Sequence, residues 1–399
     1  MQADVLVIGA GPAGSAAARS LASKGAAVVL VDQFEFPRDK ICGDGLVADS
    51  FHALDRLGLK ERVLRECQRA DVMHIRTPNQ GRIELNAELA SAPRAQLDKV
   101  LQDAAVEAGA QLLAPYKLSA ACEENDAVTG AGFSHARSGA ELQVNARFTL
   151  LATGAAARPL ELFGVCERKR PSGVAARVYC KVDAALAARF PHFMISLDNA
   201  TSPGYRWIFP LPENRFNLGV GCFYDGKRLP NGNVRELFNS FVKEFPPARL
   251  LVNKAREMTE LKGAPVRTAL TGAKFSRPGL LVVGEAAGMT YSFSGEGIGK
   301  ALESGIIAAE ILMLYFRGAI SFEQASASYA KQIRDKFDQR FRSYKSAQSW
   351  AARRGVCDFL AWRANRGRYV RTQLEGILAE SLHPGVLFSL PGMLNALIR

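Results

Sequence analysis

A glycine-rich turn between two apolar runs constrains the fold of this chain more than any other feature. The stretch DVLVIGAGPAGSAAARSLASKGAAVVLVD occupies residues 4–32, with apolar runs at 5–8 and 28–31. Such continuous runs are typical of parallel strands that are buried on both faces. Gly9, Gly11 and Gly14 allow a tight turn, the close approach of a pyrophosphate, and close packing of a helix on the first strand. The stretch predicts a Rossmann-like, dinucleotide-binding α/β unit.

The residues around this turn indicate how the dinucleotide is held. The predicted helix begins at Pro12 and Ala13, so its free N–H groups and positive dipole end point at the phosphates. Asp32 ends the second apolar run, where a carboxylate accepts hydrogen bonds from ribose hydroxyls. The complete context of strand, turn, helix and acid favours a bound dinucleotide over a purely structural turn. Its position near the N-terminus favours FAD over NAD.

Composition describes a globular protein with a basic surface. The 399 residues carry a net charge of +12, and 48% of them are hydrophobic. The seven cysteines are scattered without C-x-x-C spacing, which fits a reducing compartment and argues against a metal site. We see no signal segment and no apolar run that could span a bilayer, so we expect a cytoplasmic protein. The basic charge suits an anionic membrane, an acidic partner or simple solubility; nucleic-acid binding has no motif behind it.

A different pattern follows in the middle of the chain and predicts a second domain. Alternating residues at 175–182, 193–197, 205–209 and 216–223 are typical of an antiparallel sheet. A buried parallel-type strand then returns at 279–284. The FAD-binding domain is therefore expected to be discontinuous, with an inserted sheet domain and a helical C-terminal region. We place the FAD-binding domain at 1–75, 92–160 and 262–318, the sheet domain at 76–91 and 161–261, and the basic helical region at 319–399.

A second glycine-rich segment begins where that returning strand ends. Gly284 and Glu285 are followed by Gly295, Gly297 and Ile298, at which a long helix starts. The acid can accept from ribityl or ribose hydroxyls. The positive end of the helix can stabilise the negative charge of a reduced flavin ring. The alternative is a second α/β turn without a ligand, and the first motif favours the flavin.

Four motifs follow one another along the chain: GAGPAG at 9–14, PRDKICGDGL at 37–46, YRWIFP at 205–210 with NLGVG at 217–221, and GEAAG…FSGEGIGKAL at 284–302. Together they resemble the geranylgeranyl reductase family of FAD-dependent oxidoreductases, within the flavoproteins built like aromatic-ring hydroxylases. The resemblance implies FAD bound by the first and last motifs. It also implies an isoprenoid or similarly apolar lipid substrate against the inserted sheet, and reduction of carbon–carbon double bonds.

The resemblance also assigns individual residues. The expected cofactor-binding set is Gly9, Gly11, Pro12, Ala13, Gly14, Asp32, Arg38, Cys42, Gly43, Arg94, Gly154, Gly284, Glu285, Gly295, Gly297 and Ile298. The expected catalytic set is Cys42, Asp44, Tyr205 and Trp207. Cys42 lies in the turn that resembles the family's flavin-facing loop, either as proton donor or as inert filler. Tyr205, Trp207 and Phe209 alternate, so they share one strand face, which is either core or the wall of a substrate slot.

Departures from the family pattern leave the electron donor and the reaction open. Ala156 stands where hydroxylase-type members carry an acid associated with NADPH use. NAD(P)H and a ferredoxin-type carrier protein are therefore both candidate reductants. A flavin monooxygenase or halogenase is the alternative activity, although the halogenase branch prefers WxWxIP to the YRWIFP found here. A prenyl-binding escort protein without flavin is a third hypothesis, against which the intact glycine motifs argue.

The C-terminal region combines basic and aromatic residues. Arginines and lysines outnumber acids there, and aromatic side chains recur at near-helical spacing at Phe337, Phe341, Tyr344 and Trp350. The apolar end, HPGVLFSLPGMLNALI, is too short to span a membrane. Two interpretations stay open: a helix lying peripherally on the inner face of an anionic membrane, or a solvated helix packed on the body through its aromatic stripe.

Overall fold

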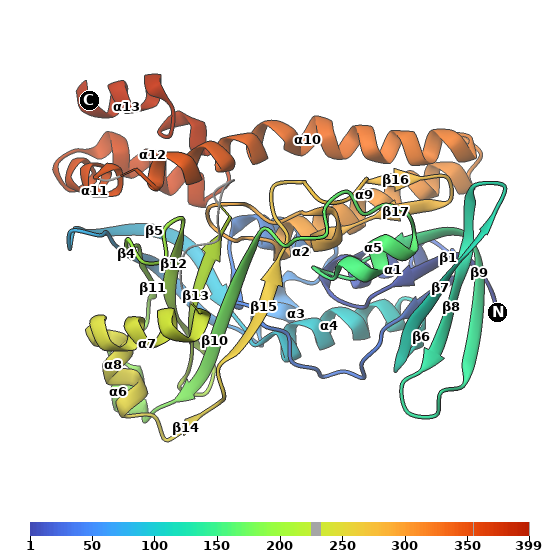
Figure 1. Ribbon diagram of the computed structural model, residues 1–399, viewed down its shortest axis with the longest axis horizontal. Helices are drawn as coiled ribbons and strands as arrows, with labels where there is room; N and C mark the ends of the chain where they lie inside the picture. Colours follow the sequence, from blue (N-terminus) through green and yellow to red (C-terminus); the bar gives the residue numbers. More distant parts are fainter. Residues whose placement is uncertain (225–232, 354, 399) are drawn as a thin grey trace.

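The computed structural model describes residues 1–224, 233–353 and 355–398 and contains two β-sheets that lie side by side along the long axis of the molecule (Figure 1). We call them the nucleotide sheet and the inserted sheet. A long helix, α10, runs over both of them, and the two termini lie at opposite ends of the molecule. Helices pack on both sheets, as expected of an α/β flavoprotein.

The nucleotide sheet contains the apolar runs that the sequence analysis identified as buried strands. Its main strands lie in the order β16-β17-β9-β1-β2-β6, and every pair except β16–β17 is parallel. An antiparallel β7–β8 hairpin extends β9 at the edge. The strands are β1 (Gln2–Ile8), β2 (Val28–Val31), β6 (Gln111–Leu113), β7 (Tyr116–Glu124), β8 (Ala127–His135), β9 (Glu141–Leu151), β16 (Ser276–Arg277) and β17 (Leu280–Val282).

Two helices from opposite ends of the sequence pack tightly against each other beside this sheet. They are α1 (Pro12–Ala22) and α9 (Ile298–Phe316). A Cβ atom at Gly305 of α9 would lie only 2.2 Å from the carbonyl oxygen of Ala13, so the helices touch backbone to backbone. The other helices of this domain are α2 (Ala48–Arg56), α3 (Lys60–Leu64), α4 (Arg94–Glu107), α5 (Ala157–Leu162) and the short η1 (Gly284–Ala287).

The inserted sheet is antiparallel except for the parallel pair β11–β4. Its strands lie in the order β14-β10-β13-β12-β11-β4-β5-β3, with β15 also paired to β10. Their bounds are β3 (Gly45–Leu46), β4 (Gln68–Arg76), β5 (Arg82–Ser91), β10 (Gly173–Lys181), β11 (Phe193–Ser196), β12 (Gly204–Leu211), β13 (Arg215–Phe223), β14 (Glu257–Met258) and β15 (Lys262–Val266). Helices α6 (Ala184–Ala187), α7 (Val234–Glu244) and α8 (Pro246–Asn253) pack on the face of the inserted sheet that points away from the nucleotide domain (Figure 1).

Strand pairing differs from the expected domain boundaries at three strands. The expected FAD-binding segments 1–75 and 262–318 include β3, most of β4, and β15, yet all three strands pair within the inserted sheet. The physical reason is that β4 and β5 form one hairpin, and β15 continues the edge of β10. The expected sheet domain also contains residues 225–232, which lie outside the described part of the chain.

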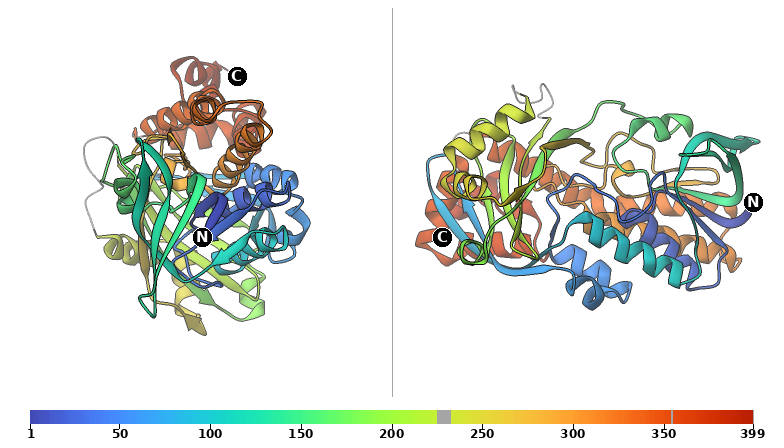
Figure 2. Two further views of the ribbon diagram at one scale, coloured as in Figure 1. Left: turned by 90° about the vertical axis from the view of Figure 1, so that its right-hand side faces the viewer. Right: turned by 90° about the horizontal axis from the view of Figure 1, so that it is seen from below.

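The C-terminal region is helical, as expected, and it packs on the body. It comprises α10 (Phe322–Ala351), α11 (Val356–Arg366), α12 (Arg368–Leu378), the short η2 (Pro384–Val386) and α13 (Leu390–Ile398). The aromatic side chains Phe337, Phe341 and Tyr344 of α10 are buried against the nucleotide domain. Figure 2 shows these helices stacked over the rest of the molecule in the end-on view. None of the described helices is long and apolar enough to cross a membrane.

The contact between α1 and α9 yields a prediction about stability. Gly305→Ala places a Cβ atom against the backbone of α1, which cannot move without disturbing β1. We expect a loss of about 1–3 kcal/mol in the free energy of unfolding, the usual cost of overpacking a core. Urea unfolding followed by circular dichroism measures it. Leu314→Ala, at an exposed position of the same helix, is the control and is expected to change stability by less than about 0.5 kcal/mol. Equal stability of both variants would contradict the contact.

Candidate functional site

The first glycine motif forms an open helix terminus beside a buried acid. Gly11 precedes α1 at the N-cap, and its helix receives no side-chain cap. Gly9 has a φ of 104°, and a Cβ there would lie 2.4 Å from the carbonyl oxygen of Ala152, so the turn requires glycine. Asp32 accepts backbone hydrogen bonds from Ala10 at 2.8 Å and from Phe34 at 2.9 Å. Burial raises the pKa of Asp32. Each carboxylate oxygen keeps acceptor capacity for a ribose hydroxyl.

Two predicted arginines meet at one carboxylate that the sequence analysis missed. Arg94 makes a bidentate pair with Asp98, with N···O distances of 2.7 and 2.8 Å. Arg38 lies 3.2 Å from the same carboxylate. Its Nη2 atom would be 3.7 Å from a Cβ at Gly11, so its guanidinium stands beside the glycine turn. The one available signal for Asp98 is its spacing of four residues from Arg94, which places both on one helix face.

The second glycine motif lies across the carboxyl ends of β9 and β17. Glu285 is 3.5 Å from Lys40 and accepts a hydrogen bond of 3.3 Å from the backbone of Arg267. Its Oε2 atom would lie 3.7 Å from a Cβ at Gly154. A Cβ at Gly284 would meet Ala13 of α1 at 2.7 Å, so Gly284 is also a packing position. Glu285 thus joins three loops at one point of the predicted cofactor site.

The start of α9 completes this side of the site. Gly297 is its N-cap without a side-chain hydrogen bond, and Ile298 is the first helical residue. A Cβ at Gly295 would approach the hydroxyl of Tyr205 to 3.0 Å. That hydroxyl donates to the carbonyl oxygen of Ser294. The second glycine motif and the aromatic strand of the inserted sheet therefore touch.

These residues fit FAD. Two helices, α1 and α9, point uncapped N-termini into the region, and such termini bind anions and stabilise negative charge. Asp32 would hold a ribose, and Arg38 would neutralise the pyrophosphate beside the turn at Gly11. The loop that contains Gly43 lies against the aromatic strand, because a Cβ there would be 3.4–3.6 Å from Phe209 and Trp207.

A hydrogen-bonded network surrounds the predicted catalytic residues of the 37–46 loop. Asp44 is fully buried and accepts from Tyr179 at 2.6 Å and from Asn217 at 2.9 Å. Asn217 also donates to the carbonyl oxygen of Cys42 at 2.8 Å. The backbone N–H of Asp44 donates to the Cys42 sulfur at 3.3 Å. Cys42 and Asp44 are thus held together by one backbone hydrogen bond and through Asn217. Their catalytic roles stay predictions.

The protonation of Asp44 is set by its surroundings. Burial raises the pKa of Asp44 to about 6, although the hydrogen bonds from Tyr179 and Asn217 oppose that shift. Its second oxygen, Oδ1, is buried and has no hydrogen-bond partner among the described residues. Burial and the charge of Asp44 raise the pKa of Tyr179, so this phenol stays protonated. The carboxyl group of Asp44 can therefore exchange a proton near neutral pH.

The network continues toward the surface through residues that sequence reasoning did not find. The Arg177 guanidinium lies 3.9 Å above the Tyr179 ring and forms an ion pair with Asp39. Asp39 also pairs with Lys262 at 3.2 Å and is about two-fifths exposed. Although partial burial opposes the shift, Arg177 and Lys262 lower the pKa of Asp39. Tyr179 therefore stands between a buried carboxyl group and a surface ion cluster.

The aromatic strand packs around the same network. Trp207 donates from its indole nitrogen to Asn217 at 2.8 Å, and its ring lies over Gly219, its cross-strand partner. The ring of Phe209 stacks on Phe193 at 4.2 Å. Trp207 is only 4% exposed, so it packs in a small apolar cluster between the inserted sheet and the 42–47 loop. Its role as a wall of a substrate slot stays a prediction.

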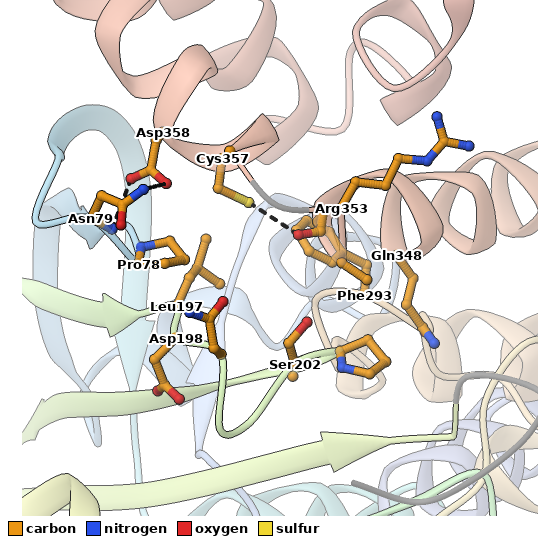
Figure 3. Close-up of a pocket in the computed structure, with 16 residues that line it drawn as sticks. Pro78, Asn79, Leu197, Asp198, Ser202, Phe293, Gln348, Arg353, Cys357 and Asp358 are labelled. Carbon is orange, nitrogen blue, oxygen red and sulfur yellow. Dashed lines mark hydrogen bonds between the residues drawn. The ribbon is translucent and has the colours of Figure 1, made fainter.

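Two cavities border this region. Figure 3 shows the first, enclosed between the end of the inserted sheet and helices α10 and α11, with Pro78, Leu197, Phe293 and Cys357 around it. Its volume of about 40 Å³ holds about one or two water molecules. The second is an open groove of about 790 Å³ between α2, α3 and the β4–β5 hairpin, which we call the hairpin groove. Its apolar lining residues are Phe51, Leu64, Ala70, Ala87 and Leu89.

Comparisons with known proteins identify the family of this chain. Residues 2–332 match the family model described as an FAD binding domain. The chain is 31% identical to the menaquinone reductase of Mycolicibacterium smegmatis over 326 residues, covering 78% of this chain and 76% of that protein. It is 29% identical to digeranylgeranylglycerophospholipid reductase 1 of Methanopyrus kandleri, covering 95% of this chain and 99% of that one.

A solved structure supports the fold over nearly the whole chain. A geranylgeranyl bacteriochlorophyll reductase-like protein from Thermoplasma acidophilum superposes with a TM-score of 0.77 and is 22% identical, covering 99% of this chain and 96% of that one. The match to the FAD-binding model includes both glycine motifs and the whole inserted sheet. The chain belongs to the FAD-binding-domain family and, within it, to the geranylgeranyl reductase family of FAD-dependent oxidoreductases.

Proposed function

We propose that this protein uses FAD to reduce carbon–carbon double bonds in a long apolar isoprenoid chain. The observation that carries the proposal is the Cys42 thiol, which accepts a hydrogen bond from the backbone N–H of the buried Asp44 and packs on one apolar cluster, while the adjoining Gly43 lies against a second cluster, that of Trp207 and Phe209. The relatives whose names specify reductases of prenyl lipids and of menaquinone support it. A proton donor in apolar surroundings is what the saturation of an unactivated alkene requires.

The hairpin groove is the site that we propose for the apolar chain. Its volume lies within the range of about 300–1,000 Å³ that is usual for small-molecule sites. Phe51 and Leu64 belong to the apolar cluster against which Cys42 packs. Leu89 belongs to the cluster of Trp207 and Phe209. The groove is thus lined by side chains of the two clusters near the proposed donor, of which Phe51, Leu64 and Leu89 are almost fully buried, and also by the polar side chains of Arg69, Asp71, Asn86 and Glu88. The apolar chain would contact the apolar part of this lining, where its burial is favourable.

Reduced FAD, when bound, supplies a hydride to one carbon of the double bond. Cys42 gives its proton to the other carbon. Asp44 then returns a proton to Cys42 and takes a new one from solvent. Tyr179 keeps its own proton and holds the Asp44 carboxyl group in place by donating a hydrogen bond to it.

A direct test uses the mass of the product. The purified holoprotein is reduced chemically without oxygen, so that the outcome does not depend on whether NAD(P)H or a ferredoxin-type carrier is the natural donor. It is then given a polyprenyl lipid. A gain of two hydrogens in mass spectrometry supports the proposal. Unchanged lipid under these conditions, with a gain of one oxygen when air is admitted, would instead establish the monooxygenase alternative.

The proton donor can be tested by substitution. Cys42→Ala removes the proton and Cys42→Ser holds it far more tightly, so both variants are expected to saturate the alkene at least about tenfold more slowly, a floor for general-acid catalysis. Both keep the absorbance of bound FAD. The matched control is Cys67→Ala, a half-buried thiol that packs on the same apolar cluster and is expected to keep wild-type turnover. Wild-type rates in Cys42→Ala would rule out the donor role.

The pH dependence tests Asp44 as the source of the returning proton. Its carboxyl group bears a proton below about pH 6, so the wild-type rate is expected to fall as pH rises through that value. Asp44→Asn keeps the volume, tolerates the φ of 66° at this position, and can accept both hydrogen bonds. This variant is expected to be slow and to lose the pH dependence. If Asp44 has only a structural role, the rate of the Asp44→Asn variant will still fall as pH rises through about 6.

The same titration predicts a stability signature. Because the folded pKa lies above the usual value of 3.8, the folded protein binds more protons than the unfolded chain between about pH 4 and pH 6. Wild-type stability from this group is therefore present at low pH and is lost as pH rises through about 6. The Asp44→Asn protein lacks that decline. Urea unfolding across this pH range checks the sign independently of activity.

The groove makes a prediction about substrate length. Ala87→Trp fills part of the hairpin groove and is expected to raise KM for a long polyprenyl lipid roughly tenfold, about 1.4 kcal/mol, without releasing FAD. A short prenyl substrate is expected to react as before. Glu84→Trp, at an exposed position of the same strand outside the groove, is the control. If both variants bind the long lipid equally well, the chain lies elsewhere.

A further inference from the structure

Helix α13 presents an apolar face to solvent. Its large, exposed hydrophobic side chains lie on one side of the helix. They are Leu390 (66% exposed), Leu394 (51%), Leu397 (59%) and Ile398 (80%). The opposite side carries Gly392 and Ala396, which are buried against the C-terminal region. No charged residue occurs between 381 and 398. A contiguous, uncharged apolar face of this kind marks an interaction surface.

The charges around α13 are segregated by sign. Residues 353–398 contain three acids, and each is engaged with the body of the protein. Asp358 accepts from Asn79, Glu375 accepts from Asn86, and Glu380 pairs with Lys300 and Arg340. Among the described residues of this segment, the exposed charged side chains are those of Arg353, Arg366 and Arg368. The outer surface of this segment is therefore basic as well as apolar.

An exposed tryptophan lies on α11, the helix that contacts α13. Trp362 is 46% exposed, and the guanidinium of Arg366 lies 4.8 Å from its ring. Arg363 of the same helix donates to the carbonyl oxygen of Ala396 at 2.7 Å and thereby fixes α13 against α11. Exposed leucine, tryptophan and arginine side chains on two such neighbouring helices are residue types that insert into the headgroup region of an anionic bilayer.

We infer that α13 and the adjacent surface of α11 dock on an anionic phospholipid membrane. The apolar side chains of α13 enter the interface, and Arg353, Arg366 and Arg368 face the phosphate groups. A second copy of the chain is a poorer occupant. One face of a helix about 14 Å long and about 10 Å wide is small beside the roughly 800 Å² per partner of a standard protein interface.

This docking surface is joined to the hairpin groove through α12. Helix α12 follows α11, and its Glu375 accepts a hydrogen bond from Asn86, which lines the groove. Docking would therefore hold a site for apolar chains beside the bilayer in which such chains dissolve. The inference about docking itself does not depend on the proposed reaction.

Vesicle flotation of the full-length protein tests the inference. Wild-type protein is expected to float with vesicles of equal parts phosphatidylglycerol and phosphatidylcholine and to stay largely unbound with pure phosphatidylcholine. The double variant Leu394→Glu/Leu397→Glu is expected to bind the anionic vesicles at least about tenfold more weakly. The control, Val106→Glu/Met258→Glu, changes two exposed apolar residues on α4 and β14, far from α13 in Figure 1, and is expected to bind as the wild type does.

Each other outcome counts against the inference. Equal flotation of the wild type and of Leu394→Glu/Leu397→Glu overturns it, provided that circular dichroism shows both folded. No flotation of the wild type overturns it as well. A wild-type dimer in sedimentation analysis that becomes monomeric in Leu394→Glu/Leu397→Glu would show that a second copy covers α13. Because no substrate or reductant is present, failure here leaves the proposed reductase activity untouched.

Discussion

The close contact between α1 and α9 is the constraint on which the rest of the structure depends. It joins the first 22 residues to a helix that begins at Ile298. At Gly305 and Gly284 no side chain beyond hydrogen fits between this helix pair and the adjoining turn. Both cofactor-facing helix termini are positioned by this one interface. After the inserted sheet, the chain returns to the nucleotide domain, where α9 packs on α1. This contact fixes the return point whatever the size of the inserted sheet.

Much of the fold followed from the sequence because its strands carry strong local patterns. The buried runs at 5–8, 28–31 and 280–282 are typical of parallel strands that are covered on both faces. The boundaries of the inserted domain were harder to predict, because they depend on which strand pairs with which. Residues 72–76 can be predicted as a strand, but no local pattern says that this strand pairs with β11.

The site was predicted in part, because local sequence patterns show which residues are close along the chain but not which strands bring distant residues together. Residues within a motif, such as Cys42 and Asp44, are neighbours in sequence and could be predicted together. Tyr179 and Asn217 are direct cross-strand partners in the register of β10 and β13, and no local pattern reveals a register. Asn217 lies within the NLGVG motif, yet its role becomes visible only when Asp44 is seen beside it. Arg177 was not predicted either, because nothing in the sequence distinguishes it from other polar residues of a strand.

The long helix α10 has a consequence for how this protein can be divided. The recognised family segment ends at residue 332, in the middle of a helix that continues to Ala351. Beyond that point Ile333, Phe337 and Phe341 are buried against the nucleotide domain, and Glu380 reaches back to Lys300. The end of the matched family segment therefore does not coincide with a structural boundary, because it crosses a continuous hydrophobic interface. A protein cut at residue 332 would expose the side chains of the nucleotide domain that α10 covers, whereas the outer face of α13 is not part of that interface.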